Sequence, residues 1–401
     1  MPKLWGGGGR FMKWAKKEEG QKVPIKSWCD PIEDGALQQA IDLSKLPIAF
    51  RHIALMPDCH QGYGMPIGGV MACNMAVVPN AVGVDIGCGM CALKTNAWAA
   101  EISETDIKKI MGLVREKVPV GKDHNKEDQV WTGFDQAPDI PIIQQQLPSA
   151  RKQLGTLGGG NHFIEIQKGD DGCVWLMIHS GSRNFGYKIA REYNKKAIRL
   201  CERWYSDIPN KDLAFLPMET KEAKEYFEAM NYALDFAMEN RQRIMWHFLA
   251  AAAKVLDCMS HEEINIHHNY AAWENHFKKN VIVHRKGATR ARKGQKGIIP
   301  GSMGTPSYIV EGLGNPNSFN SCSHGAGRKM GRAEASRVLS QKECDQAMEG
   351  IVYGRWGQDR KGNPDFGEAP QAYKDIEDVI EAESDLVKPI IKLWPLGVIK
   401  G

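Results

Sequence analysis

The sequence predicts an α+β fold in a single large domain, with central β-sheets flanked by helices. Short runs rich in β-branched and aromatic residues are separated by glycines, which is typical of strands. One long stretch lacks proline and glycine, which is typical of a helix. No proline- or serine-rich linker divides the 401 residues. We therefore expect one domain over residues 1–401, in which residues 1–45 are the least certain part.

Three runs predict strands, and each lies next to a histidine. Phe163–Ile166 begins just after His162, Val174–Ile178 ends at His179, and Val281–Val283 runs into His284. The helical stretch covers about Thr220 to Val255 and is rich in Ala, Glu, Lys, Met and Leu. We expect its aromatic residues to pack in the core. They include Tyr226, Tyr232, Phe236 and Trp246.

The composition is that of a globular protein, with 42% hydrophobic and 25% charged residues. The net charge of +4 is nearly balanced, so phosphate binding would have to come from local basic clusters. The start of the chain has a glycine run, Gly6–Gly9, but no apolar segment typical of a signal peptide, and we expect no membrane span. Ten cysteines spread over a chain of this size predict reduced thiols and a cytoplasmic location.

Residues capable of chemistry gather in glycine-rich segments. These segments read M-P-D-C-H-Q-G-Y-G (56–64), V-G-V-D-I-G-C-G-M-C (82–91), L-G-T-L-G-G-G-N-H-F-I-E (154–165), M-I-H-S-G-S-R (177–183), N-I-H-H-N-Y (265–270) and S-C-S-H-G-A-G-R (321–328). A further run, P-G-S-M-G-T, covers residues 300–305.

Five residues of these segments predict a metal site. Asp85 and Cys88 lie three positions apart on a turn that its glycines leave free to bend, so both side chains can face one ion. His162 and His179 stand at strand ends, and His268 adds a third imidazole. This set suffices for two metals bridged by the thiolate, an arrangement suited to phosphoryl chemistry. The alternative is that each histidine is a hydrogen-bonded structural residue.

Cys88 and Cys91 also form a C-x-x-C pair. This spacing occurs in redox pairs and in zinc ribbons. A zinc ribbon needs a second such pair, which the other cysteines do not supply. Redox use remains an alternative.

His324 is surrounded by small residues, which would let a phosphate approach its ring. A neutral imidazole can attack phosphorus to form a phosphoramidate. From spacing alone, a metal ligand or a general base would look the same. Arg328 and Arg332 follow at i+4 and i+8, so they would face an anion together if the segment were helical.

The segment 284–297 carries six Lys or Arg residues and no acidic residue. Its interleaved glycines and alanines favour a phosphate-contacting loop, with Lys286 as the first candidate; the alternative is a solvated charged face. Glycine-rich stretches suit nucleotide phosphates because their backbone N–H groups can face an anion. None of them matches the P-loop pattern.

Taken together, these motifs resemble the RtcB family of RNA-splicing ligases. The resemblance extends from about Lys45 to the terminal L-G-V-I-K-G. It rests on V-G-V-D-I-G-C-G-M, G-T-L-G-G-G-N-H-F, H-S-G-S-R, H-H-N-Y, P-G-S-M-G and S-C-S-H-G-A-G-R.

The resemblance implies two Mn²⁺ ions bridged by Cys88. His179 and His268 would hold one ion, and Asp85 and His162 the other. By the usual affinity order such a donor set prefers zinc, so we expect zinc to bind and inhibit. His324 would be the nucleophile that becomes guanylylated.

The resemblance also implies the nucleotide and RNA contacts. Tyr373 would pack on the guanine base, and Arg183, Arg328 and Arg332 would hold RNA phosphates. The remaining GTP contacts would come from Asn161, His162, Phe163, Ile164, Glu165, His268, Asn269, Pro300, Gly301, Ser302, Met303, Ser307, His324, Gly325, Ala326, Gly327 and Lys400.

The family's reaction would join an RNA 3′-phosphate or 2′,3′-cyclic phosphate to a 5′-hydroxyl through a histidine–GMP intermediate. An archease-type activator is a possible partner by family habit. A dimetal phosphoesterase using the same ligands is the alternative activity, and a non-catalytic RNA-binding factor is a third hypothesis.

Two positions depart from the family's pattern. Cys59 stands in P-D-x-H where the family often has Val, and Cys91 stands where it often has Asn. Neither is a matched ligand, so the core chemistry should survive. The first ~30 residues, including the glycine run, carry no resemblance that predicts a role.

Overall fold

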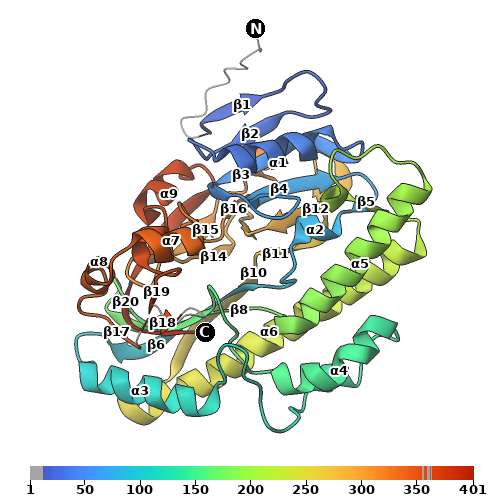
Figure 1. Ribbon diagram of the computed structural model, residues 1–401. Coiled ribbons are helices and arrows are strands. Elements are labelled where there is room, and N and C mark those ends of the chain that lie inside the picture. The colour runs from blue at the N-terminus through green and yellow to red at the C-terminus, as the bar shows by residue number, and fades with distance from the viewer. Residues whose placement is uncertain (1–11, 355, 359–361, 363) are drawn as a thin grey trace.

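The structure, a computed structural model, describes residues 12–354, 356–358, 362 and 364–401. It mixes helices with two large sheets, which confirms the α+β prediction (Figure 1). Gly6–Gly9 lies outside the described residues. Within the described part, no helix combines the length and the apolar character needed to cross a bilayer.

The first large sheet has six strands in the order β1-β2-β3-β4-β12-β11. All neighbours pair antiparallel except β2 and β3, which are parallel. Segments far apart in sequence thus lie side by side. The strands are β1 Trp14–Lys16, β2 Ile25–Ser27, β3 Ala49–His60, β4 Ile67–Cys73, β12 Lys279–Lys286 and β11 Asn269–His276.

The second large sheet has eight strands, with β10-β6-β8-β7-β20-β15-β14 in order and β17 beside β20. The C-terminal strand β20 lies inside this sheet, where Lys400 pairs with Phe163. Its members are β6 Gly89–Trp98, β7 Phe163–Gly169, β8 Cys173–Ser180, β10 Ser260–His267, β14 Lys296–Ile299, β15 Ser307–Gly312, β17 Val352–Tyr353 and β20 Val387–Lys400.

The predicted strand runs lie in β7, β8 and β12, so these predictions are confirmed. Three two-stranded ladders complete the sheets. They are β13 Ala288–Arg290 with β16 Ser321–Ser323, β5 Ala76–Val77 with β9 Leu216–Pro217, and β18 Gly357–Gln358 with β19 Pro364–Asp365.

The predicted long helix is α6, Lys221–Leu256. It begins where the Thr220 hydroxyl accepts a hydrogen bond from the Ala223 N–H at 3.2 Å, and it ends at Asp257 in the left-handed conformation. It packs against α3, α5 and strands of the second sheet (Figure 1). The other helices are α1 Asp34–Lys45, α2 Pro79–Val82, α3 Glu104–Lys117, α4 Pro141–Gln153, α5 Arg183–Arg203, α7 Arg332–Val338, α8 Gln341–Gln346 and α9 Ile376–Ala382.

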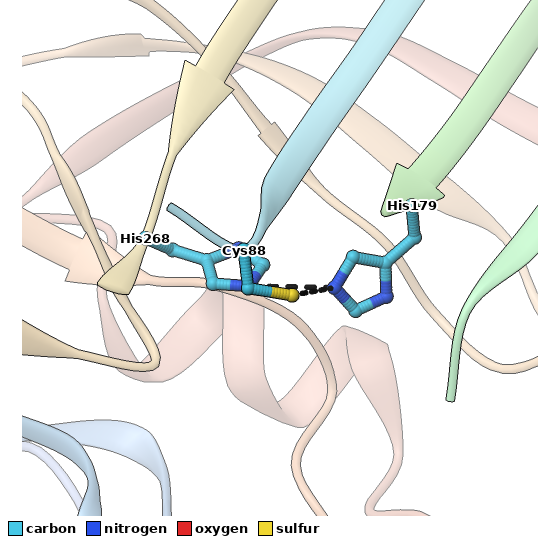
Figure 2. A group of neighbouring side chains, drawn as sticks. All are labelled: Cys88, His179 and His268. Carbon is cyan, nitrogen blue, oxygen red and sulfur yellow. Dashed lines mark hydrogen bonds between the residues drawn. The ribbon is translucent and has the colours of Figure 1, made fainter. Parts of the chain in front are cut away.

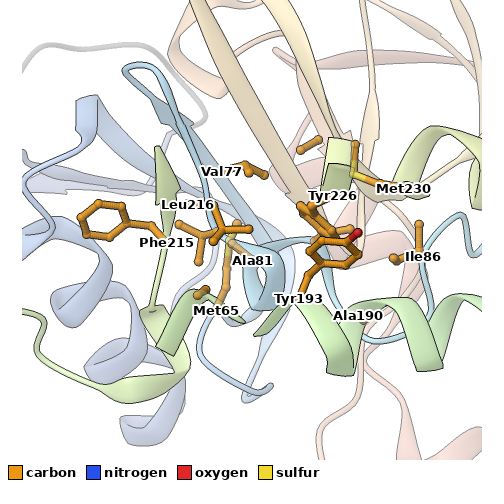
Figure 3. Packing of buried hydrophobic residues seen from close by; sticks show 14 of the residues in the cluster. Met65, Val77, Ala81, Ile86, Ala190, Tyr193, Phe215, Leu216, Tyr226 and Met230 are labelled. Carbon is orange, nitrogen blue, oxygen red and sulfur yellow. The ribbon is translucent and has the colours of Figure 1, made fainter. Parts of the chain in front are cut away.

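Most of the aromatic residues of α6 pack as predicted. Tyr226, Tyr232 and Phe236 are buried, and the Tyr226 ring lies 5.2 Å from the Tyr193 ring of α5 (Figure 3). The prediction for Trp246 is wrong, because 57% of it is exposed. Ile244, Met245 and Phe248 beside it are buried, so Trp246 lies on the face of the helix that the core does not cover. Composition alone could not tell which aromatic side chains face the core.

A buried ion pair ties the first sheet to the segment that leads to His324. Arg285 Nη1 of β12 lies 2.6 Å from Glu274 Oε1 of β11, and both side chains are almost fully buried. The Arg285 Nη2 and Nε groups donate to the Phe319 carbonyl and the Ser321 hydroxyl, both at 2.9 Å. Burial alone would raise the pKa of Glu274, but Arg285 and His276 lower it to about 2.

We expect Glu274→Ala to lower the free energy of unfolding by about 3–5 kcal/mol, because it leaves the Arg285 charge buried without its partner. Denaturant unfolding measures this loss. In the matched control, Glu104→Ala removes the exposed partner of Lys108 and should cost no more than ~0.5 kcal/mol. Equal losses in the two variants would contradict a stabilising role for the buried pair.

Candidate active site

The five predicted ligands stand at one edge of the second sheet. Cys88 directly precedes β6, His162 directly precedes β7, His179 is the penultimate residue of β8, and His268 follows β10. The strands run in the order β10-β6-β8-β7 with antiparallel neighbours, so alternate starts and ends meet at the same edge. Asp85 lies on the turn between α2 and β6.

The structure brings these residues together in two groups that share Cys88. One is Cys88, His179 and His268, and the other is Asp85, Cys88 and His162; within each, the ligand atoms lie within 4.8 Å of one another. Figure 2 shows the thiol of Cys88 pointing at the His179 ring, with Sγ 3.2 Å from Nε2. The His179 and His268 Nε2 atoms are 3.3 Å apart, and His162 Nε2 lies 3.2 Å from Asp85 Oδ2.

Backbone carbonyls fix the orientation of two of the rings. The His162 Nδ1 lies 2.9 Å from the Leu157 carbonyl oxygen, and the His179 Nδ1 lies 3.2 Å from that of Asn161. Each contact suits a ring that donates from Nδ1 and keeps the Nε2 lone pair free. Rings held in this way are typical of metal-binding histidines. The His268 Nδ1 has no hydrogen-bond partner among the described residues.

The electrostatics of the cluster fit a cation. Burial, together with neighbouring imidazoles, lowers the pKa of His179 and His268 well below the usual value, so both rings are neutral at neutral pH. Burial and the charge of Asp85 raise the pKa of Cys88. Neutral imidazoles, a carboxylate and a thiol that can ionise offer electron pairs without a positive charge of their own. The donor chemistry therefore fits a divalent metal.

One glycine is required by the close packing around His162. A Cβ on Gly158 would lie 2.6 Å from His162 Nδ1 and 2.1 Å from Arg183 Nη1. Gly158 also has a φ of +98°, which favours glycine. Arg183 begins α5 and donates to the Thr156 hydroxyl at 3.0 Å and the Gly121 carbonyl at 2.8 Å.

His324 follows β16 and borders the cluster, with its ring centroid 4.8 Å from that of His268. Its Nδ1 lies 2.6 Å from Asp58 Oδ2, and its backbone N–H donates to the same oxygen at 3.1 Å. Because Asp58 engages Nδ1, Nε2 is the ring nitrogen available to a substrate. Sequence reasoning missed Asp58, although the P-D-C-H motif contains it.

A cleft of about 860 Å³ opens over the cluster and His324. Asp85, Cys88 and His268 line it. The other predicted residues along it are Asn161, Asn269, Lys286, His324, Arg328 and Arg332. The arginines supply positive charge where phosphates would be bound.

The sequence predicted a loop over the basic segment 284–297, but the structure corrects this. Much of the segment forms the end of β12, the whole of β13 and the start of β14. Its charges fall on alternating sides of these strands, so Arg285 is buried in the ion pair with Glu274. Lys286 does reach the cleft. Its Nζ donates to the carbonyls of Tyr63 and Asn80, and burial lowers its pKa to about 7.

Arg328 and Arg332 do not share a helix, since α7 begins only at Arg332. They meet instead at Glu368, which lies 3.3 Å from Arg328 Nη1 and 2.6 Å from Arg332 Nε. Glu368 also accepts from the Tyr373 hydroxyl and lies 3.2 Å from Lys400 Nζ. Burial alone would raise the pKa of Glu368, but Lys400 and Arg332 lower it to about 2. Nothing in the local sequence pattern pointed to this residue.

A smaller cavity of about 260 Å³ lies beside Glu368 and is also lined by Met303, Arg332 and Lys400. The Lys400 Nζ stands 5.6 Å above the centre of the Phe163 ring. Predicted nucleotide contacts from three separate parts of the chain therefore meet here.

The other residues predicted to contact the nucleotide lie outside this cavity. Ile164 lies in the hydrophobic core, and within the sheet it stands in register with Ile178 of β8 and Ile399 of β20. Burial raises the pKa of Glu165 to about 8, and its carboxylate accepts from Gln167 at 2.7 Å. The P-G-S-M turn approaches the His324 loop, where the Ala326 N–H donates to the Pro300 carbonyl at 2.9 Å. Gly301, Ser302 and Ser307 belong to the same turn region, and Gly325 and Gly327 to the His324 loop.

The two cysteines of the C-x-x-C pair have different positions, because Cys88 directly precedes β6 and Cys91 lies within it. Cys88 belongs to the cluster, whereas the Cys91 thiol lies 3.7 Å from a carboxylate oxygen of Glu263. All ten cysteines are free. The two thiols therefore have separate surroundings rather than forming a redox pair.

The fold and the site define a class of protein: an α+β protein in which a mostly buried cluster of thiol, imidazole and carboxylate groups lies beside a histidine held by a carboxylate. Arg328 and Arg332 line the cleft over this cluster. The family model described as tRNA-splicing ligase RtcB matches residues 39–401, and the chain belongs to this family.

Proteins similar to this chain bear the same family name. The RNA-splicing ligase RtcB1 of one Escherichia coli strain is 39% identical over 95% of this chain and 98% of its own length. The RNA-splicing ligase RtcB of Escherichia coli K12 is 38% identical with the same coverage. The tRNA-splicing ligase RtcB of Pyrobaculum aerophilum is 32% identical over 95% of each chain.

We expect Cys88→Ala to abolish the binding of divalent metal, because both ligand groups share this thiol. Isothermal titration with Mn²⁺ in the absence of nucleotide measures the loss. Cys91→Ala is the matched control, since it removes a thiol three positions away that faces Glu263, and it should bind metal normally. Normal binding by Cys88→Ala would rule out the shared thiolate.

Metal affinity should also rise with pH. The raised pKa of Cys88 keeps its thiol protonated in the metal-free protein, so an ion must displace this proton to bind. Release of one proton makes the affinity increase by about tenfold per pH unit until the thiol ionises by itself. Titrations in buffers of different ionisation enthalpy count the protons released, and a pH-independent affinity would contradict this mechanism.

Proposed function

We propose that this protein is a GTP- and Mn²⁺-dependent RNA ligase. It joins an RNA 3′-phosphate or 2′,3′-cyclic phosphate to a 5′-hydroxyl end, in RNA splicing or repair. The observation that carries the proposal is His324 itself: Asp58 holds its Nδ1, and its ring borders the metal-type cluster in a cleft that Arg328 and Arg332 line. Membership of the RtcB family supports the activity.

The first step uses His324 as a nucleophile. In the neutral form that donates its Nδ1–H to Asp58, the imidazole presents the Nε2 lone pair. This nitrogen attacks the α-phosphorus of GTP, a P–N bond forms, the α–β P–O bond breaks and pyrophosphate leaves. Asp58 stabilises the positive charge that the ring gains during the attack.

Two Mn²⁺ ions would be held by the clustered ligands, with His179 and His268 on one, Asp85 and His162 on the other, and Cys88 on both. When bound, the metals supply charge stabilisation for the phosphates that converge on the site. The choice of Mn²⁺ rests on the family, since the donor set by itself favours zinc.

GTP would be held along the path from His324 to the smaller cavity. Tyr373 would pack on the guanine, with Lys400 and Glu165 at its polar edge. Asn161–Glu165, Pro300–Met303 and the His324 loop would contact the rest of the nucleotide. Arg183, Arg328 and Arg332 would hold RNA phosphates, and their charge offsets the repulsion between converging anions.

The remaining steps act on RNA. A 2′,3′-cyclic phosphate is first opened by water to give a 3′-phosphate. The 3′-phosphate attacks the phosphorus of the histidine-linked GMP, and the P–N bond breaks, which frees His324. The RNA 3′-phosphate then carries GMP, a good leaving group, where the free 3′-phosphate had only a poor one. The 5′-hydroxyl of the second fragment then attacks the activated end, GMP leaves, and a 3′–5′ phosphodiester remains.

The expected location is the cytoplasm, because a chain with ten free thiols suits a reducing compartment. An archease-type protein is proposed as a possible activator on the strength of the family alone.

We expect the protein to become labelled by α-labelled GTP and Mn²⁺, with a bond that is lost in acid and stable in alkali. Denaturing electrophoresis detects the label. His324→Ala should take up none, whereas His247→Ala, a change at an exposed position of α6, should label normally. Labelling of His324→Ala would place the nucleophile elsewhere. Phosphate release from RNA without any label would favour a dimetal phosphoesterase.

Asp58→Asn should slow labelling by on the order of 10²- to 10⁴-fold, because the amide can donate to Nδ1 and stabilise the unreactive tautomer. Single-turnover labelling at saturating GTP measures the rate. Mn²⁺ affinity should be unchanged, since Asp58 is not one of the clustered ligands. A wild-type rate would exclude a role for Asp58 in orienting His324.

A further inference from the structure

Two neighbouring polar residues, Asn240 and Arg241, are fully buried in the middle of α6, and the proposed reaction uses neither. A buried guanidinium is costly unless its N–H groups are satisfied. The hydrogen-bond partners of Arg241 in the described part of the chain are carbonyl, amide and imidazole groups, with no carboxylate among them. Burial of Arg241 therefore indicates that its hydrogen bonds have a role that offsets this cost.

Arg241 contacts the chain next to three of the clustered ligands. Its Nη1 donates to the carbonyl of Gly87, which precedes Cys88, at 2.8 Å, and to that of Ser180, which follows His179, at 3.0 Å. Its Nη2 lies 3.1 Å from Nδ1 of His267, which precedes His268. Its Nε donates to Asn265 of the same strand at 2.7 Å.

Asn240 holds the other side of the cluster. Its Oδ1 accepts from the Gly155 and Thr156 N–H groups at 2.7 and 3.2 Å. Its Nδ2 donates to the Ser180 hydroxyl at 3.0 Å and to the Gly181 carbonyl at 3.1 Å. The Ser180 hydroxyl donates in turn to the Leu157 carbonyl at 2.7 Å.

These bonds connect Asn240 to the remaining ligands. The Leu157 carbonyl is the group that orients the His162 ring, at 2.9 Å from its Nδ1. Gly181 packs directly on Asp85, since a Cβ at this glycine would lie 2.5 Å from Asp85 Oδ1. Two adjacent side chains of one helix thus hold the chain beside all five ligands, either directly or through one or two intermediate groups.

We propose that Asn240 and Arg241 are positioning residues that set the geometry of the metal ligands before metal binds, an inference that rests on the proposed function. The reason is geometric. The ligands come from four separate turns, and a shift of one turn relative to another would separate them. One long, packed helix gives all four turns a common rigid reference, so little reorganisation remains when an ion enters.

Arg241→Lys tests the role of Arg241. Lysine keeps the charge and the aliphatic stem but has one nitrogen, which cannot reach all the partners of the guanidinium. We expect Mn²⁺ affinity, titrated without nucleotide, to fall by about 10- to 100-fold. Labelling by GTP should return towards the wild-type rate at saturating Mn²⁺, because the ligands themselves are intact.

Two further variants keep the test decisive. Arg243→Lys, on the same helix but paired with Glu239 at 2.7 Å, is the matched control and should bind Mn²⁺ as the wild type does. Ser180→Ala removes the hydroxyl between Asn240 and Leu157 with little change in volume. It should also weaken Mn²⁺ binding, and it decides the question if Arg241→Lys does not fold. Circular dichroism and thermal unfolding report folding in each case.

Wild-type Mn²⁺ affinity in folded Arg241→Lys and in Ser180→Ala would overturn the positioning role and leave the proposed function intact. If Arg241→Lys does not fold, wild-type affinity in Ser180→Ala is enough to overturn it. An equal loss in Arg243→Lys would also overturn it, because the effect would then belong to the helix in general. If the wild-type protein binds no Mn²⁺, the proposed function fails, and the positioning role fails with it.

Discussion

The structure depends on holding a thiol, three imidazoles and a carboxylate within contact distance in a mostly buried site. The lone pairs of these groups repel one another, and burial removes the water that would otherwise solvate the groups. The antiparallel register of β10, β6, β8 and β7 brings their turns to one edge, and carbonyl groups then fix the His162 and His179 rings. The arrangement resembles a cation site whose protein part is already assembled.

His324 reaches this site from a separate part of the chain, and its placement needs its own support. The segment before it is tied to the first sheet by Arg285, which is itself paired with Glu274. Asp58, at the end of β3, then holds the ring and the backbone of His324. The first sheet therefore positions the histidine and the second sheet positions the metal-type cluster, so the cleft between them is where their chemistry can be combined.

Glu368 performs a similar task beside the smaller cavity. Its carboxylate gathers Arg328, Arg332, Tyr373 and Lys400, which come from separate segments of the chain. Like charges would otherwise keep the two arginines and the lysine apart, and one buried anion offsets their repulsion. A few buried polar residues thus organise the site. They include Asp58, Glu368, Asn240 and Arg241, none of which is among the predicted ligands.

The sequence by itself determined the α+β class, the strands next to His162 and His179, the long helix α6 and the residues that form the cluster. These features depend on local patterns: alternation, helix propensity, and glycines that leave room around ligand-type side chains. Other features depended on which face of a helix or strand is covered, and neighbouring segments decide this. They are the exposure of Trp246, the strands within segment 284–297 and the separation of Cys91 from Cys88. The roles of Asp58, Glu368, Asn240 and Arg241 also appeared only in the tertiary structure. Most of their partners lie tens to hundreds of residues away in sequence, and a hydrogen bond across that distance leaves no local pattern to detect.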